Sequence, residues 1–157
     1  MCPPDSRLRN YCSDGRFWSA VGFVPFWGGD LPIWFYTYAK EPTPRQIRIA
    51  RAILDYPHNL RGVVENGVFD YYQTHVFGAI DFGDPVVEKE CAPCLTEPGQ
   101  VWRLIPGAEI WISQFCKQGF EEAIEFKLTF ECSWDEEHSL GVKFRDWQIV
   151  GFGGAAS

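Results

Sequence analysis

Long hydrophobic runs are missing from this chain. No apolar stretch reaches the ~18 residues that a membrane-spanning helix requires, and the polar N-terminal segment contains no hydrophobic region of a secretory signal. We therefore expect no membrane partner and a cytoplasmic location. The six cysteines are then expected to be reduced thiols rather than a disulfide framework.

Basic residues are also scarce. The chain has 14 Lys and Arg against 21 Asp and Glu, which gives a formal net charge of −7 at pH 7. Nucleic-acid binding requires a basic stripe, and apart from one face of a predicted helix the chain has no Lys/Arg cluster, so a nucleic-acid partner is not expected. An acidic surface favours solubility, or a basic partner attracted by electrostatic steering.

Motifs that carry catalysis are absent as well. The sequence contains no phosphate-binding loop, no dinucleotide fingerprint and no nucleophile motif. Cys91 and Cys94 form a Cys-x-x-Cys pair, but Pro98-Gly99 follows closely and no βαβ pattern surrounds the pair. We interpret both as ordinary loop thiols, with zinc ligands as the alternative. No enzyme activity, cofactor or metal is expected.

Aromatic residues, in contrast, make up 17% of the chain. This is more than a small core needs, and Trp and Tyr are enriched at interfaces. The segment from residue 17 to 38 is apolar on both faces of its predicted strands, so its aromatic side chains are either core or a binding surface. The candidates for partner contact in this segment are Trp18, Trp27, Trp34 and Tyr36.

The hydrophobic pattern predicts one α+β domain. Residues 1–16 are interpreted as a loose N-terminal arm and residues 17–157 as the domain. Residues 17–38 predict two strands joined by a Gly-Gly-Asp turn. Thr43, Pro44 and Gln46 have the spacing of a helix N-terminus with a capping box.

A second helix is predicted from Asn59 to Val76. The short link between the two helices predicts that they pack against each other as an antiparallel hairpin on one face of a mostly antiparallel sheet. Residues 81–100, rich in proline, are interpreted as a loop.

The clearest strand runs from Ala123 to Trp134, because apolar and polar residues alternate strictly along it. The chain after it predicts two further strands in an antiparallel meander. The loop between the first two of these strands is acidic, with the sequence Asp135-Glu136-Glu137-His138. Its carboxylates could satisfy backbone N–H groups in the turn, and they are also candidates for partner contact.

This C-terminal stretch resembles an uncharacterised bacterial domain family with a Cys-x-Trp-Asp-Glu-Glu-His-Gly-x-Gly-Val motif. Besides the acidic loop, the matching positions are Cys132, Trp134, His138, Gly141 and Val142. One position departs: Ser139 stands where the motif has glycine. If that glycine adopts a positive φ, a serine there strains or reshapes the turn.

The resemblance implies a size and general character similar to those of the small acidic immunity proteins that accompany bacterial toxins. We therefore expect a non-catalytic protein-binding domain whose partner is a cognate bacterial toxin. The acidic charge of this chain favours a basic toxin. Two other functions stay open at the sequence level. One is a metal-dependent hydrolase centred on Asp135, Glu137 and His138, and the other is an accessory domain that binds sugars through tryptophans.

Overall fold

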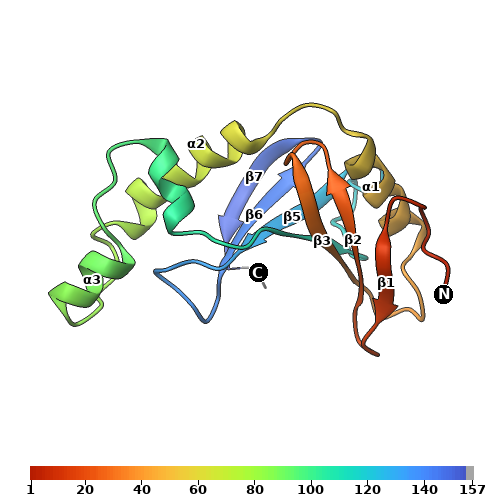
Figure 1. The fold of residues 1–157 in the computed structure, drawn as a ribbon, viewed down its shortest axis with the longest axis horizontal. Coiled ribbons are helices and arrows are strands. Elements are labelled where there is room, and N and C mark those ends of the chain that lie inside the picture. The colour runs from red at the N-terminus through yellow and green to blue at the C-terminus, as the bar shows by residue number, and fades with distance from the viewer. Residues whose placement is uncertain (155–157) are drawn as a thin grey trace.

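The computed structural model describes residues 1–154, which form one seven-stranded sheet with helices over one face (Figure 1). The strands lie in the order of the sequence. Their bounds are β1 Arg9–Ser13, β2 Trp18–Val24, β3 Gly29–Tyr36, β4 Glu109–Ser113, β5 Glu125–Phe130, β6 Leu140–Arg145 and β7 Gln148–Gly153. All neighbours are antiparallel except β3 and β4, which are parallel. The predicted mixed, mostly antiparallel architecture is confirmed.

A long crossover joins the parallel strands β3 and β4. It contains α1 Pro44–Asp55, α2 Arg61–Tyr71, the π-helical turn η1 Tyr72–Val76, α3 Pro85–Cys91 and the 3₁₀ turn η2 Pro98–Arg103. The predicted loop at residues 81–100 therefore includes a short helix, which begins at Pro85 with Asp84 as its cap. None of the helices in residues 1–154 is long and apolar enough to cross a membrane.

The predicted packing of two helices as a hairpin is not confirmed. The two helices follow one another along the sheet (Figure 1), with α1 against β2 and β4 and α2 against β7 and η2. The N-terminus of α1 is as predicted: Thr43 caps it, Pro44 occupies its first turn, and Gln46 completes the capping box. The link of residues 56–60 is short but extended, which carries α2 away from α1.

The core lies between the helices and one face of the sheet. It includes Phe35 of β3, Ile112 of β4, Leu128 of β5 and Phe144 of β6, all inaccessible to solvent, together with Val64 and Val68 of α2. Phe126, Leu128 and Phe130 of β5 are buried as the alternation predicted, but Thr129 is buried as well, and the strand ends at Phe130 instead of Trp134. The opposite face of β3 to β6 has no helix over it (Figure 1).

Boundaries near the N-terminus also differ from the prediction. Residues 1–16 contribute β1, which pairs with the outer side of β2, and the buried Leu8 anchors its start. The turn between β2 and β3 comprises residues 25–28 and so includes only the first glycine of the Gly-Gly-Asp sequence, because Gly29 and Asp30 already pair with Val24 and Phe23. Gly28, with φ +79, supplies the turn's left-handed residue.

Candidate functional site

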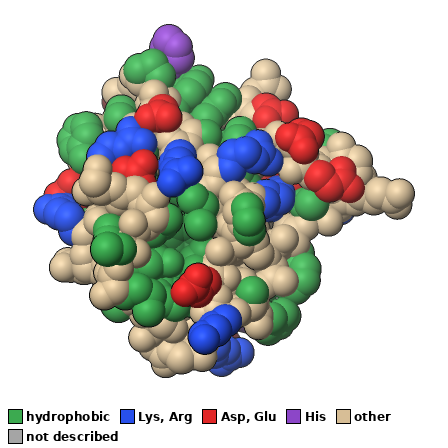
Figure 2. Space-filling view, turned by 90° about the vertical axis from the view of Figure 1, so that its right-hand side faces the viewer, with side chains coloured by type: hydrophobic (Ala, Val, Ile, Leu, Met, Phe, Trp, Pro, Cys, Tyr) green, Lys and Arg blue, Asp and Glu red, His purple; other side chains and the backbone are tan. Residues whose placement is uncertain are grey.

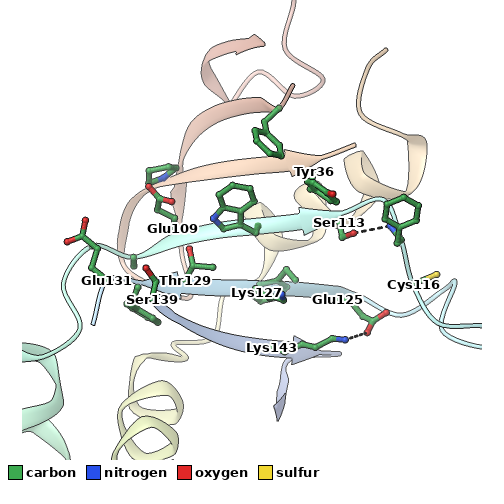
Figure 3. Close-up of a pocket in the computed structure, with 18 of the residues that line it drawn as sticks. Tyr36, Glu109, Ser113, Cys116, Glu125, Lys127, Thr129, Glu131, Ser139 and Lys143 are labelled. Carbon is green, nitrogen blue, oxygen red and sulfur yellow. Dashed lines mark hydrogen bonds and ion pairs between the residues drawn. The ribbon is translucent and has the colours of Figure 1, made fainter. Parts of the chain in front are cut away.

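The uncovered face of the sheet forms a groove. Its volume is about 950 Å³, and its walls come from strands β3 to β6 and from the segments that flank β4, at residues 107–108 and 115–117. Figure 3 shows how the polar side chains of these strands line it. In the space-filling view, hydrophobic side chains gather at a hollow that charged side chains of both signs surround (Figure 2).

Aromatic rings line one side of the groove. Trp34 and Trp111 occupy paired positions on the parallel strands β3 and β4, and their rings stack at 5.3 Å between centroids. Phe17 approaches Trp111 edge-on at 5.7 Å. Beside them, the hydroxyl groups of Tyr36 and Tyr38 are hydrogen-bonded at 2.6 Å. These contacts hold the rings in place on the open face before any partner arrives.

A network of charges surrounds Glu125 at one end of the groove. Its carboxylate lies 3.0 Å from Nη2 of Arg145, 3.5 Å from Nη2 of Arg45 and 3.9 Å from Nζ of Lys143. The Glu125 side chain is only 11% exposed. Three basic side chains thus converge on one largely buried carboxylate, which leaves this end of the groove with an excess of positive charge.

Lys127 and Lys143 face each other across β5 and β6 at the centre of the groove. Trp111 is the partner of Lys127 on the other side, so one rung of the sheet carries Trp34, Trp111, Lys127 and Lys143 in a row. Burial, reinforced by the positive charge of Lys143, lowers the pKa of the Lys127 ammonium group. Like charges directly opposite each other on a sheet are unfavourable.

This geometry suits binding. Glu125 is engaged by three basic groups rather than held next to a nucleophile, and lysines beside stacked indoles offer charge and apolar surface to a ligand. Within residues 1–154, no group of three or more His, Cys, Asp or Glu side chains comes together as a metal site.

The four aromatic residues predicted to contact a partner divide into two pairs. Trp18 and Trp27 are core residues, with exposed fractions of 6% and 9%. Trp18 donates from its indole N–H to the carbonyl of Lys40, and Trp27 packs edge-on against Trp102. Trp34 and Tyr36, in contrast, project from the open face of β3, where Tyr36 lines the groove.

The acidic loop is a hydrogen-bonded turn. The backbone N–H of His138 donates to Oδ1 of Asp135, and its ring Nδ1 lies 3.0 Å from the same oxygen. Glu136 and Glu137 are exposed beside it, so they remain available to a partner. Within residues 1–154, the hydrogen-bond partner of His138 is thus Asp135 of its own loop, whereas the hydrolase alternative requires metal ligands from other segments.

The residues on either side of this turn are part of the core or of the sheet. Cys132 and Trp134 are buried, and burial raises the pKa of the Cys132 thiol to about 11. The thiol donates to the carbonyl of Asp135, and Gly141 continues into β6 opposite Thr129. Ser139 adopts φ +59, the left-handed conformation inferred for the glycine of the motif, and it lines the groove.

The cysteine pair lies away from the groove. Cys91 is the last residue of α3 and Cys94 is exposed just beyond it, and all six cysteines are free. The pair thus follows a helix, whereas a thioredoxin-like site begins one.

Sequence reasoning did not identify Trp111, Lys127, Lys143 and Arg45 as site residues. The alternation of β5 placed Lys127 on the solvated face, which is where it lies. The missing information was which strands lie beside it, because Trp34 and Trp111 are brought together only by the long crossover between β3 and β4, which contains all the helices of residues 1–154.

The model of one protein family matches residues 7–157. This chain belongs to the family described as domain of unknown function DUF6985. The match begins before β1, so the DUF6985 domain includes the whole sheet and residues 7–16 of the segment that was interpreted as an arm. Membership of an uncharacterised family is thereby confirmed. No curated protein and no solved structure matches the chain significantly.

Proposed function

We propose that this DUF6985 domain is a non-catalytic protein-binding domain that receives a segment of its partner on the open face of the sheet. The observation that carries the proposal is the groove of about 950 Å³, lined by Trp111, which stacks on Trp34, and by Phe17, Tyr36 and Phe115, on a sheet face that no helix of residues 1–154 covers (Figure 1). Pre-positioned Trp and Tyr side chains are the residue types that anchor protein interfaces.

The specific form that we propose is an immunity protein that neutralises a cognate toxin. The net charge of −7 supports it, because an acidic surface accelerates encounter with a basic partner. The six free cysteines fit the reducing cytoplasm, where such a protein would act. The resemblance of the acidic loop motif led to the same hypothesis.

A sugar-binding role would use the pair Trp34 and Trp111, but the arrangement of their rings favours sugar binding less than protein binding. Trp34 and Trp111 stack face to face at an interplanar angle of 12°, and the edge of Phe17 meets Trp111. A sugar platform needs ring faces that are open to the ligand. A glycan array gives a direct comparison, and specific retention of one glycan class that Trp111→Ala abolishes would replace protein binding as the leading function.

Photo-crosslinking inside the producing cell tests the proposal. A benzoylphenylalanine at position 36 faces the groove, whereas the same residue at position 63 lies on the exposed side of α2, where Val63 is 45% exposed. We expect one dominant protein adduct at position 36 and none of that mass at position 63. Adducts of equal yield at both positions would contradict a specific role for the groove.

The adduct is then identified by mass spectrometry and reconstituted from purified components. Trp111→Ala is expected to weaken the affinity at least about tenfold, as loss of an aromatic anchor does. Co-expression separates the specific from the general proposal: an immunity protein restores growth to cells that produce the partner, and Trp111→Ala loses this protection. A non-toxic partner would refute the immunity role while protein binding stands.

A further inference from the structure

The last strand of the sheet, β7, has an unpaired edge. β6 pairs with one side of β7, and within residues 1–154 no strand pairs with the other side (Figure 1). Charged side chains and proline protect many edge strands against a further strand, and the six residues of β7 include neither. A register shift at Val150 distorts the first half of β7, but Gly151, Phe152 and Gly153 pair regularly with β6. The second half of β7 therefore offers its outer N–H and C=O groups to another chain.

The other edge of the sheet, β1, is protected against strand addition. Arg9 forms an ion pair with Asp30 at 2.8 Å, Asn10 has φ +55, and the pairing with β2 is irregular between Arg9 and Cys12. Charge and an irregular backbone both disfavour pairing with an added strand. Strand addition is therefore expected at β7 and not at β1.

A hollow of about 360 Å³ lies beside β7, on the face of the sheet that α2 covers. Ile149 and Phe152 line it from β7, and Tyr71, whose ring stacks on Phe152 at 5.0 Å between centroids, lines it from α2. Sheets bind extended segments with this arrangement, because the backbone of the segment pairs with the free edge while pockets beside the edge receive every second side chain.

The helical wall of the hollow includes the π-helical turn η1. Such turns are rare, and they are frequent at functional sites. Tyr72 and Val76 of η1 are buried, whereas Thr74 and His75 are exposed and line the hollow. The exposed part of the lining is thus polar, and the part between Tyr71 and β7 is apolar.

Asp70 gives the hollow a negative charge. Its exposed carboxylate lines the hollow, and among residues 1–154 it has no hydrogen-bond or ion-pair partner. In the same part of the chain no Lys or Arg side chain lines the hollow, and the net charge of the whole chain is −7. A basic side chain two residues from an apolar one lies on the same face of a strand, so it would complement this carboxylate.

We propose that β7 accepts an extended segment of a partner protein as an eighth strand of the sheet, with an apolar side chain in the hollow and a Lys or Arg side chain beside Asp70. A second copy of the chain fits less well, because β7 itself has no basic side chain and two chains of net charge −7 repel each other. The site lies on the helix-covered face of the sheet, so the inference does not depend on the function proposed for the groove.

A phage library of random linear peptides provides the probe. It is selected against the full chain, and peptides that also bind Thr74→Trp are discarded, because this variant fills the hollow from an exposed position. Asn66→Trp is the matched control, since it places the same side chain on an exposed position of α2 outside the hollow. Asp70→Asn removes the charge, and Glu90→Gln removes one from an exposed position of α3. Circular dichroism and thermal unfolding confirm that each variant is folded.

The retained peptides are expected to share an apolar residue two positions from a Lys or Arg. In calorimetry the leading peptide should bind Asp70→Asn about two- to fivefold more weakly, as expected for an exposed ion pair. Its affinity should be unchanged for Asn66→Trp, for Glu90→Gln and for the groove variant Trp111→Ala. In the complex, amide hydrogen exchange within residues 148–153 should slow at least about tenfold while β1 is unaffected, because only the edge of β7 gains hydrogen bonds.

Four outcomes would overturn the inference. A selection in which every peptide also binds Thr74→Trp shows that the hollow takes no segment, and unchanged exchange in residues 148–153 with the peptide bound contradicts strand addition. Equal affinity for the unmodified chain and Asp70→Asn removes the role of the basic side chain. Analytical ultracentrifugation of the free chain covers the last case: a dimer that Thr74→Trp converts to a monomer would assign the edge to a second copy.

Discussion

Ser139 stands where the pattern that this loop resembles has glycine, and its backbone has the conformation that glycine tolerates best. Its φ is +59, while its N–H donates to the carbonyl of Asp135 at 3.0 Å. A side chain in the left-handed region crowds the following carbonyl, and this costs about 1–2 kcal/mol for a residue other than glycine.

We therefore expect Ser139→Gly to raise the free energy of unfolding by about 0.5–1 kcal/mol, because part of the relieved strain is offset by the greater freedom of glycine in the unfolded chain. Urea denaturation measures the change. Ser139→Ala is the control, since it removes the hydroxyl group and retains the Cβ atom. A gain of equal size in both variants would assign the effect to the hydroxyl group instead of the backbone.

At the scale of elements, Gln46 joins the start of α1 to two strands. The side chain is fully buried. Its Oε1 accepts from the N–H of Thr43 at 2.9 Å, and its Nε2 donates to the carbonyls of Tyr36 at 2.8 Å and Ile112 at 2.9 Å. Gln46 therefore caps the helix and bridges β3 and β4 at their parallel pairing.

Gln46→Leu keeps a similar volume and removes all three hydrogen bonds. We expect it to lower the free energy of unfolding by about 2–3 kcal/mol, because buried backbone groups lose their partners. Gln73→Leu is the matched control: its amide makes one bond, to the carbonyl of Leu95, from an exposed position. A loss in the control as large as that in Gln46→Leu would show that burial of the polar groups is not the cause.

Two glycines in α2 distinguish helix propensity from packing. A Cβ atom on Gly67 would lie 2.9 Å from Cδ1 of Ile149 and 3.1 Å from Cζ of Phe152, both on β7, whereas a Cβ atom on Gly62 meets no atom within 4 Å. Gly67 thus sets how closely the helix approaches the last strand, and Gly62 has no such role.

We expect Gly62→Ala to stabilise the protein by up to about 1 kcal/mol, which is the helix-propensity difference. The same change at Gly67 should destabilise it by about 1 kcal/mol, because crowding against β7 outweighs the propensity gain. Thermal and urea unfolding of the two variants, compared directly, give the answer. Stabilisation by both would indicate that β7 moves aside at little cost.

At the scale of the whole molecule, the sequence predicted those features that depend on residues close together in the chain, namely strand alternation and the start of a helix. Phe126 and Leu128 alternate with Glu125 and Lys127, so the C-terminal strands and their buried face followed from the sequence. Thr43 and Gln46 likewise identified the start of α1. Each of these signals depends on contacts between residues that are a few positions apart.

Long-range pairing was beyond such patterns. Trp34 and Trp111 have no local relation, and only the parallel pairing of β3 with β4 stacks them. The same pairing creates the open face, so the groove could not be predicted residue by residue. The burial of Trp18 and Trp27 could not be predicted from the sequence either. A strand rich in aromatic residues has the same pattern whether helices cover its aromatic face or leave it open.

The charge distribution of the whole molecule supplies the last prediction. Lys127 has a lowered pKa because it is partly buried and faces Lys143. A lysine whose folded-state pKa lies below its unfolded value opposes folding at neutral pH, and this penalty disappears as the pH rises through the folded pKa toward 10.5. Removing the neighbouring charge should therefore act in a predictable direction.

We expect Lys143→Met to raise the pKa of Lys127 and to increase stability at neutral pH by about 0.2–1 kcal/mol, the range for a like-charge pair across strands. The advantage over the unmodified chain should shrink as the pH rises through the folded-state pKa of Lys127, because the Lys127 ammonium group then loses the charge that Lys143 repels. Nuclear magnetic resonance of the lysine side chain measures the pKa, and urea unfolding at each pH measures stability. An unchanged Lys127 pKa in Lys143→Met would mean that burial alone sets the shift.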